Sequence, residues 1–135
     1  MRWTIKILAM VGLIVALSAG GASASTTLII TGTNGDDQIK GTSRAEEIRG
    51  LGGSDEITDG LGRDLVYGGA GGDNLIGYGG DTSVDRFYGG AGSDIIQSRD
   101  VPAVKDYVGC GLGVDHVYAD KADIVSSNCE RVSTW

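Results

Sequence analysis

The sequence predicts an all-β solenoid built from nine-residue units, two of which make one coil of 18 residues. Glycine supplies 24 of the 135 residues, and every glycine after residue 24 lies between Gly32 and Gly113. Over residues 32–76 an acidic residue recurs every nine positions, and an apolar residue follows it two positions later. A short fixed period of this kind is typical of stacked repeat proteins, in which each unit packs on its neighbours.

The first 24 residues have the pattern of a secretory signal peptide. Arg2 and Lys6 precede a short apolar run at 7–17, and an A-x-A cleavage pattern ends the segment at Ala24. A membrane anchor is the alternative, but the apolar run is shorter than the ~20 residues that span a bilayer. We therefore expect a secreted, extracellular chain without a membrane span, beginning with a lead-in at 25–31.

Five units follow one another without a gap from residue 32 to residue 76. They read GTNGDDQIK, GTSRAEEIR, GLGGSDEIT, DGLGRDLVY and GGAGGDNLI. The sixth residue of each unit is acidic and the eighth is Ile, Val or Leu. We expect the last three residues to form a short strand with the eighth facing inward, and the glycines to turn the chain.

Later units keep the pattern with looser spacing. The unit 77–88 carries three extra residues, 89–97 is regular, 98–108 contains the only proline, and 109–118 follows. The repeat array is therefore predicted over 32–118, and residues 119–135 are predicted to cap it.

The recurring form G-G-x-G-x-D-x-U-x, where U is apolar, resembles the calcium-binding nonapeptide of RTX (haemolysin-type) proteins. Units 68–76 and 89–97 match it at every defined position, whereas 41–49 has one glycine and Glu46 in place of aspartate. The tail ADIVSSNCERV also resembles the end of small secreted bacterial proteins of this kind. The resemblance implies a right-handed parallel β-roll whose turns bind calcium.

The spacing itself favours calcium. Alternate units turn at opposite edges of the coil, so Asp37, Asp55, Asp73, Asp94 and Asp115 share one edge, and Glu46, Asp64, Asp85 and Asp106 share the other. Stacked strands lie ~4.8 Å apart, which is twice a Ca²⁺–oxygen distance of ~2.3–2.6 Å and loose for Mg²⁺. Histidine and free cysteine, which zinc and copper prefer, are scarce.

The predicted calcium ligands are turn carboxylates and turn carbonyls. The carboxylates are Asp37, Asp55, Asp64, Asp73, Asp85 and Asp94, and the carbonyls belong to Gly35, Gly53, Gly62, Gly69, Gly71, Gly90 and Gly92. Glu46, Asp106 and Asp115 are further candidates. The alternatives are a plain surface acid for Glu46, and a loss of register after Pro102 for Asp106 and Asp115. Acids at other repeat positions are expected to be solvated charge, and these are Asp36, Glu47, Glu56 and Asp59.

Several ions would also explain how so thin a stack folds. Two carboxylates ~4.8 Å apart repel by ~3.5 kcal/mol at an effective dielectric constant of ~20. Burying one aliphatic side chain per unit does not offset the entropy of ordering nine residues. We therefore expect the array to fold as it binds calcium, the alternative being a calcium-free solenoid held by apolar stacking.

The two cysteines, Cys110 and Cys129, allow a single pairing. In an exported chain a disulfide between them is the expected state. Its loop of about 20 residues would contribute ~3 kcal/mol in the chain-entropy model. We expect it to close the cap.

The composition argues against catalysis and against nucleic acid as a partner. The chain has one histidine, and it lacks H-E-x-x-H, G-x-S-x-G and phosphate-loop motifs. Its net charge of −7 is unsuited to phosphate binding. The leading hypothesis is a secreted, non-catalytic calcium-binding protein. The alternative is an adhesion or ligand-binding protein in which calcium is purely structural and the sheet faces or Tyr67, Tyr88 and Tyr118 contact the ligand.

Overall fold

The computed structural model describes residues 27–77, 79–80 and 82–135, so the predicted signal peptide lies outside the described residues. These residues form 12 strands in two parallel six-stranded sheets, ordered β1-β3-β5-β7-β9-β11 and β12-β10-β8-β6-β4-β2. The strands are β1 Leu28–Thr31, β2 Gln38–Lys40, β3 Glu46–Gly52, β4 Glu56–Thr58, β5 Leu65–Ala70, β6 Asn74–Ile76, β7 Arg86–Ala91, β8 Ile95–Gln97, β9 Tyr107–Leu112, β10 His116–Ala119, β11 Ile124–Val125 and β12 Arg131–Thr134. The fold is the predicted all-β parallel solenoid.

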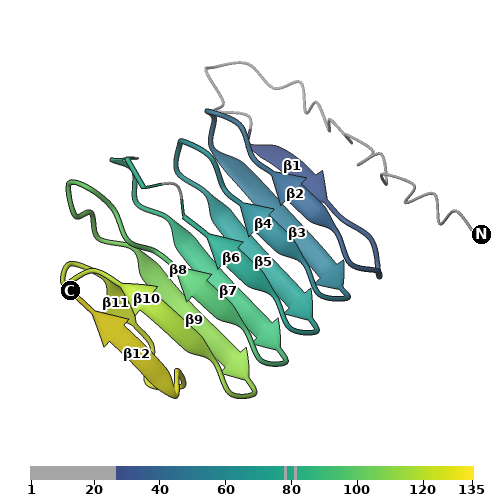
Figure 1. Ribbon diagram of the computed structural model, residues 1–135. Coiled ribbons are helices and arrows are strands. Elements are labelled where there is room, and N and C mark those ends of the chain that lie inside the picture. The colour runs from purple at the N-terminus through teal and green to yellow at the C-terminus, as the bar shows by residue number, and fades with distance from the viewer. Residues whose placement is uncertain (1–26, 78, 81) are drawn as a thin grey trace, which may run out of the picture.

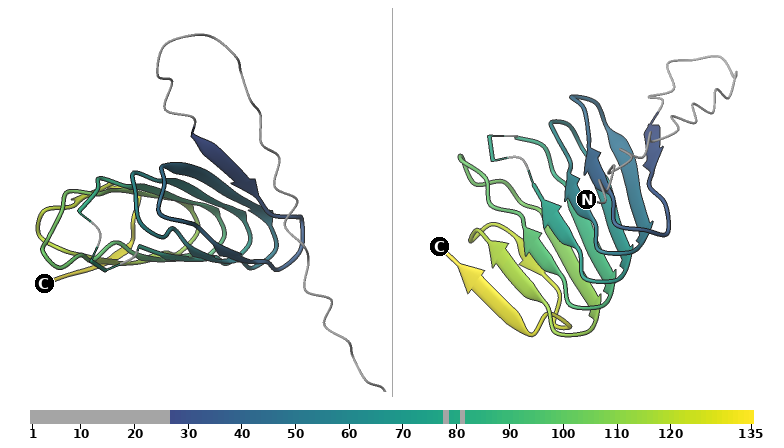
Figure 2. Two further views of the ribbon diagram at one scale, coloured as in Figure 1. Left: turned by 90° about the horizontal axis from the view of Figure 1, so that it is seen from above. Right: turned by 45° about the vertical axis from the view of Figure 1, so that its right-hand side comes forward.

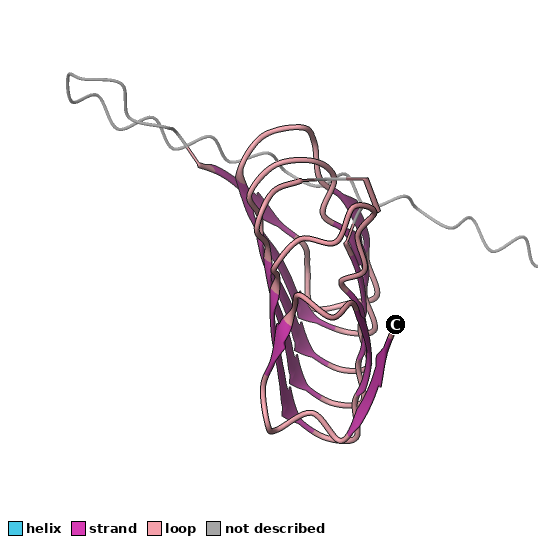
Figure 3. Ribbon diagram, turned by 90° about the vertical axis from the view of Figure 1, so that its left-hand side faces the viewer, coloured by secondary structure: helices cyan, strands magenta, loops and turns pink. Residues whose placement is uncertain are grey.

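Successive strands alternate between the sheets, so one strand of each sheet and two turns make a coil. Figure 1 shows the coils stacked along the chain, and Figure 2 shows their flattened cross-section. The two sheets form opposing layers joined at both edges by turns (Figure 3). Each strand pairs in register with the strand one coil away, as in Ile57 opposite Leu75 and Val66 opposite Phe87.

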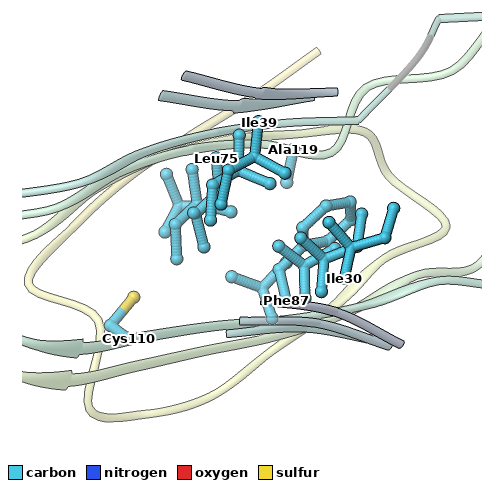
Figure 4. Packing of buried hydrophobic residues seen from close by; sticks show 12 residues of the cluster. Ile30, Ile39, Leu75, Phe87, Cys110 and Ala119 are labelled. Carbon is cyan, nitrogen blue, oxygen red and sulfur yellow. The ribbon is translucent and has the colours of Figure 1, made fainter. Parts of the chain in front are cut away.

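The core is one side chain thick on each sheet. Residues alternate across a strand, so only the central position of x-U-x faces inward. Figure 4 shows these side chains meeting between the sheets, with Ile30 and Phe87 on one side and Ile39 and Leu75 on the other. The whole cluster comprises Ile30, Ile39, Ile48, Ile57, Val66, Leu75, Phe87, Ile96, Val108, Cys110, Val117 and Ala119.

The inserted residues lie in turns at a single edge, so the register of the strands survives. Equivalent acids are 18 residues apart in the early coils and 21 apart in the later ones. In Figure 1 the turns at the lower right are short and uniform, whereas those at the upper left are longer and vary. We call these the regular edge and the long-loop edge. The alternative in which Asp106 and Asp115 lose register is thereby excluded.

The solenoid extends beyond the predicted array at both ends. Residues 28–31, expected as part of a lead-in, form β1 and pair with β3. Residues of the expected cap form β11 and β12, which pair with β9 and β10. The predicted Cys110–Cys129 disulfide is present and joins β9 to the last turn, with the two Cα atoms 5.2 Å apart. No helix in the described part of the chain is long and apolar enough to cross a membrane.

Candidate metal centre

The turns of the regular edge carry a ladder of carboxylates. The backbone N–H of each acid donates to Oδ1 of the aspartate one coil further on. These bonds run from Asp37 to Asp55 at 2.9 Å, from Asp55 to Asp73 at 2.9 Å, from Asp73 to Asp94 at 2.8 Å and from Asp94 to Asp115 at 2.8 Å. One oxygen of each carboxylate therefore holds the stack together.

The second oxygen of the same carboxylates is buried and unsatisfied. Oδ2 of Asp55, Asp73, Asp94 and Asp115 is shielded from solvent and has no hydrogen-bond partner among the residues that the structure describes. Leaving a buried charged oxygen without a partner costs several kcal/mol. Four orphaned acceptors in one row are what a bound cation would satisfy.

Glycine at the first position of a unit leaves room for this second carboxylate oxygen. A Cβ at Gly68 would lie 2.5 Å from Oδ2 of Asp73 and 2.5 Å from the carbonyl oxygen of Gly89. A Cβ at Gly89 would likewise meet Oδ2 of Asp94 and the carbonyl oxygen of Cys110. A carboxylate oxygen and a main-chain carbonyl oxygen thus converge on the same small space in each turn. Two acceptors that face each other repel unless a cation lies between them.

Burial perturbs the titration of these acids. Desolvation raises the pKa of Asp94 to about 6, against the lowering effect of the hydrogen bond from the Asp73 backbone; the charges of Asp73 and Asp115 add to the rise. Desolvation likewise raises the pKa of Asp55 and Asp73. Without a cation, the folded chain resists full ionisation of this row.

A second ladder runs along the long-loop edge. The backbone N–H of Glu46 donates to Oδ1 of Asp64 at 2.8 Å, and the series continues through Asp85 and Asp106 to Asp123. Glu46 is 1% exposed, so it is no surface acid. The predicted sorting of acids between the two edges is the one that the fold produces.

Asp59 corrects one sequence-based expectation. It was predicted to be solvated, but it is 1% exposed and its carboxylate lies with those of Asp64 and Asp85, with ligand atoms all within 4.8 Å of one another. It occupies the first position of its unit, where most other units have glycine. That substitution was the available signal. The other acids of this group, Asp36 and Glu56, are exposed, and Glu47 is half-buried beside Arg49.

Two acids beyond the predicted ligands extend the ladders. Asp123 accepts from the backbone of Asp106 at 2.9 Å, and Glu130 accepts from that of Asp115 at 3.0 Å. Asp106 lies near a further buried acid, Asp100. The pKa of Asp106 is raised to about 8, chiefly by desolvation and then by the charges of Asp100 and Asp85. The spacing of acid and apolar residue was the available signal for both extensions, because Val125 follows Asp123 and Val132 follows Glu130 by two positions.

The predicted carbonyl donors lie in the turns. Gly53, Gly71 and Gly92 have positive φ and stack so closely that a Cβ at Gly71 would overlap the carbonyl oxygen of Gly53. The remaining predicted donors, Gly35, Gly62, Gly69 and Gly90, also lie in turns or at the ends of the strands that lead into them. The carbonyl oxygen that converges with Oδ2 of Asp73 beside Gly68 is that of Gly89, a first-position residue outside the predicted donor set.

The donor set fits a hard cation. Carboxylate and carbonyl oxygens suit Ca²⁺, and the site has no nitrogen or thiolate donor of the kind that zinc prefers. The described histidine, His116, lies on the outer face of β10, where its Nε2 is 2.7 Å from a guanidinium nitrogen of Arg131. Both cysteines are in the disulfide.

Comparison with protein families gives the same picture. The family model described as the RTX calcium-binding nonapeptide repeat matches the chain in four copies, at residues 29–43, 40–75, 49–84 and 79–100. Together these matches span more than half of the chain. Comparison with curated proteins and with solved structures gave no match.

Proposed function

Because the chain belongs to the family of RTX calcium-binding nonapeptide-repeat proteins, we propose that it is a secreted, non-catalytic protein that binds several calcium ions between stacked turns and folds as it binds them. The observation that carries the proposal is the row of buried Oδ2 atoms at Asp55, Asp73, Asp94 and Asp115, each without a hydrogen-bond partner in the described residues. The convergent carbonyl oxygens supply neutral donors beside them.

The two carboxylate oxygens of each turn aspartate have different roles. Oδ1 of each aspartate accepts the N–H of the preceding coil and fixes the turn, so the backbone orients the carboxylate. Oδ2 and the first-position carbonyl then offer oxygen to the cation from two successive coils. Bound calcium supplies the positive charge that lets these oxygens approach one another.

Coupling of folding to binding follows from the same atoms. The apolar core is a single row per sheet, and in the described residues the buried Asp and Glu side chains are as numerous as the buried apolar ones, with 12 of each. Burial of ionised carboxylates opposes folding in the absence of a counter-charge. Binding of the metal only by the folded state then makes calcium affinity a part of folding stability.

Calcium titration of the mature chain tests the proposal. Isothermal titration should give about four to six ions per chain, one for each well-formed pair of stacked turns. Far-UV circular dichroism should change from a disordered to a β-rich spectrum over the same range of calcium. Fewer than two bound ions would contradict the site assignment, and a β-rich spectrum in excess chelator that calcium leaves unchanged would contradict the coupling.

Secretion is supported by the disulfide, since such bonds persist in oxidising compartments. Expression of the full chain with its N-terminal segment should release a product that begins after Ala24. Intact-mass measurement of the released protein checks the cleavage site. Retention of the whole chain inside the cell would contradict this part of the proposal.

A second candidate is an extracellular ligand-binding protein in which calcium is purely structural. It is favoured by Tyr67 and Tyr88, whose exposed rings stack on the outer face of β5 and β7 with centroids 5.2 Å apart. Recovery of one defined ligand in calcium but not in chelator would support this candidate. The two functions differ only in whether the outer sheet face binds anything.

A further inference from the structure

The outer face of the sheet that begins with β1 has a hollow beside β9. Its volume is about 560 Å³, and its walls include Tyr88, Tyr107, Gly109, Ile124, Ser126 and Asn128. The size lies within the range of small-ligand sites. The hollow exists because of one residue, since Gly109 occupies the register position that Tyr67 and Tyr88 occupy on the two preceding strands.

The rings of Tyr67 and Tyr88 form a stack that ends at the hollow. The rings of Tyr67 and Tyr88 are nearly parallel, with an interplanar angle of 16°, so Tyr67 covers one face of the Tyr88 ring. A Cβ at Gly109 would lie 3.1 Å from Cδ1 and 3.4 Å from Cε1 of Tyr88, which places the other side of that ring next to Gly109. A flat group in the hollow would therefore become the next layer of the stack.

The far wall of the hollow is polar. Ser126 lies beside Gly109 in the next coil, because its N–H donates to the carbonyl oxygen of Val108 at 2.8 Å. Ser126 and Asn128 are both exposed. A ligand between Tyr88 and this wall meets an aromatic ring on one side and hydroxyl and amide groups on the other. That combination selects a ring with an apolar face and a hydroxyl-bearing rim.

The charges around the hollow further restrict the class of ligand that it can bind. No charged residue lines the hollow, although the chain as a whole carries a net charge of −7. One charged group beside the hollow, Arg86, lies over the Tyr107 ring at 5.2 Å from its centroid. A polycation has no partner here, and a polyanion would approach an acidic molecule against its field.

From these features we propose that the hollow over Gly109 binds a neutral pyranose ring of a glycan. The apolar C–H face of the sugar stacks on Tyr88, and its hydroxyl groups bond with Ser126 and Asn128. This site deepens the second candidate function and requires the folded chain, but it uses none of the turn carboxylates.

The test uses three neutral hexasaccharides as probes, built from β-1,4-linked glucose, β-1,4-linked N-acetylglucosamine and α-1,4-linked glucose. Saturation-transfer NMR on the calcium-loaded protein should show transfer to ring C–H protons of at least one probe, and titration should give its Kd. Substitution Gly109→Tyr extends the tyrosine stack and fills the hollow. Its φ is outside the positive region, and only an exposed ring must shift to admit the new Cβ.

The matched control is Thr58→Tyr, which adds a tyrosine at the same repeat position on the opposite sheet. We expect Gly109→Tyr and Tyr88→Ala to weaken binding by about tenfold or more, and Thr58→Tyr to leave it unchanged. Circular dichroism in calcium confirms that each variant is folded, so a failure of calcium-dependent folding is told apart from a failure of this site.

Three results would overturn the inference. One is the absence of transfer to all three probes with the folded protein. Another is equal binding by Gly109→Tyr and the parent chain. The third is binding in the hollow of a proline-rich peptide, a polyanionic glycan or a second copy of the chain instead of the neutral probes, each tested in the same titration or by sedimentation.

Discussion

At the scale of single residues, the sixth-position aspartate has two oxygens with different roles. Oδ1 of Asp73 accepts the backbone N–H of Asp55 and so belongs to the folded scaffold. Oδ2 is buried, has no hydrogen-bond partner within the described chain and faces the carbonyl oxygen of Gly89. An amide in place of the carboxylate would keep the first role and reverse the second, because its nitrogen donates where the oxygen could only accept.

Asp73→Asn is therefore expected to separate scaffold from metal binding. The amide oxygen keeps the bond from Asp55, and the amide nitrogen donates to the Gly89 carbonyl. Isothermal titration should show weaker binding at the two sites that share Asp73, while circular dichroism in chelator should show as much β-structure as the parent or more. Asp36→Asn is the matched control, since Asp36 also accepts an N–H from the next coil, that of Ser54 at 2.7 Å, but is exposed.

Calcium binding by Asp73→Asn that equals that of the parent chain would show that Oδ2 is not a ligand. An equal loss in Asp36→Asn would show that net charge, rather than the buried oxygen, sets the affinity. The two variants remove the same charge, so only position distinguishes them.

Two residues depart from the repeat pattern at single positions. Leu51 has φ of 85° at a site where the next three coils have glycine, at Gly69, Gly90 and Gly111. Asp59 replaces a first-position glycine and is buried. Both departures are visible in the aligned units, but whether an acid there faces water or the inside of the turn depends on the neighbouring coils, which the sequence of one unit does not specify.

At the scale of elements, the spacing between the acid and the apolar residue predicts register. Because the strand is only x-U-x, its inward residue is fixed once the acid is placed, and the insertions can lie only in the turns. What the pattern could not predict is that strands continue without glycine. β1 and β12 lie outside the glycine-rich span, and they form because a paired edge strand on the neighbouring coil offers N–H and C=O groups to any extended segment.

The last coil of the stack is held by the disulfide between Cys110 and Cys129. Cys110 replaces the first-position glycine of its turn, and its bond to Cys129 spans two successive coils. Its sequence separation of 19 residues corresponds to a stabilisation of ~3 kcal/mol in the chain-entropy model. The last coil has few other stabilising contacts, since β11 is two residues long and all of β12 is exposed.

The double variant Cys110→Ser/Cys129→Ser is expected to loosen the final coil before the rest. Hydrogen exchange in calcium should speed up at the N–H groups of Ile124 and Ser126, which donate to β9 and the turn before it. The N–H of Asn74, which donates to Asp55 in the middle of the stack, is the internal control. Protection of Ile124 equal to that in the parent would show that the coil needs no covalent closure, and thiol reduction of the parent should reproduce the variant.

At the scale of the whole molecule, the fold buries most of its ladder carboxylates and leaves the rings of Tyr67 and Tyr88 exposed. Two carboxylate ladders run the length of the two edges, and a core of one side chain per strand separates them. Such a molecule has little apolar burial to oppose the cost of the buried charge. Protons and calcium are the two species that can relieve this cost, so they compete for the same oxygens.

This competition predicts opposite effects of pH with and without calcium. The pKa of Asp94 is raised to about 6 and that of Asp106 to about 8, both chiefly by burial, from an ordinary value of 3.8. The ion-free folded state therefore binds more protons than the unfolded state between about pH 4 and 8, and its stability falls as pH rises through this range. In chelator, β-structure and melting temperature should be higher at pH 5 than at pH 8. Calcium affinity should instead increase from pH 5 to pH 8, as protons leave the ligands. Asp94→Asn should flatten both dependences, and a chelated protein that gains stability towards pH 8 would show that its buried acids ionise without cost.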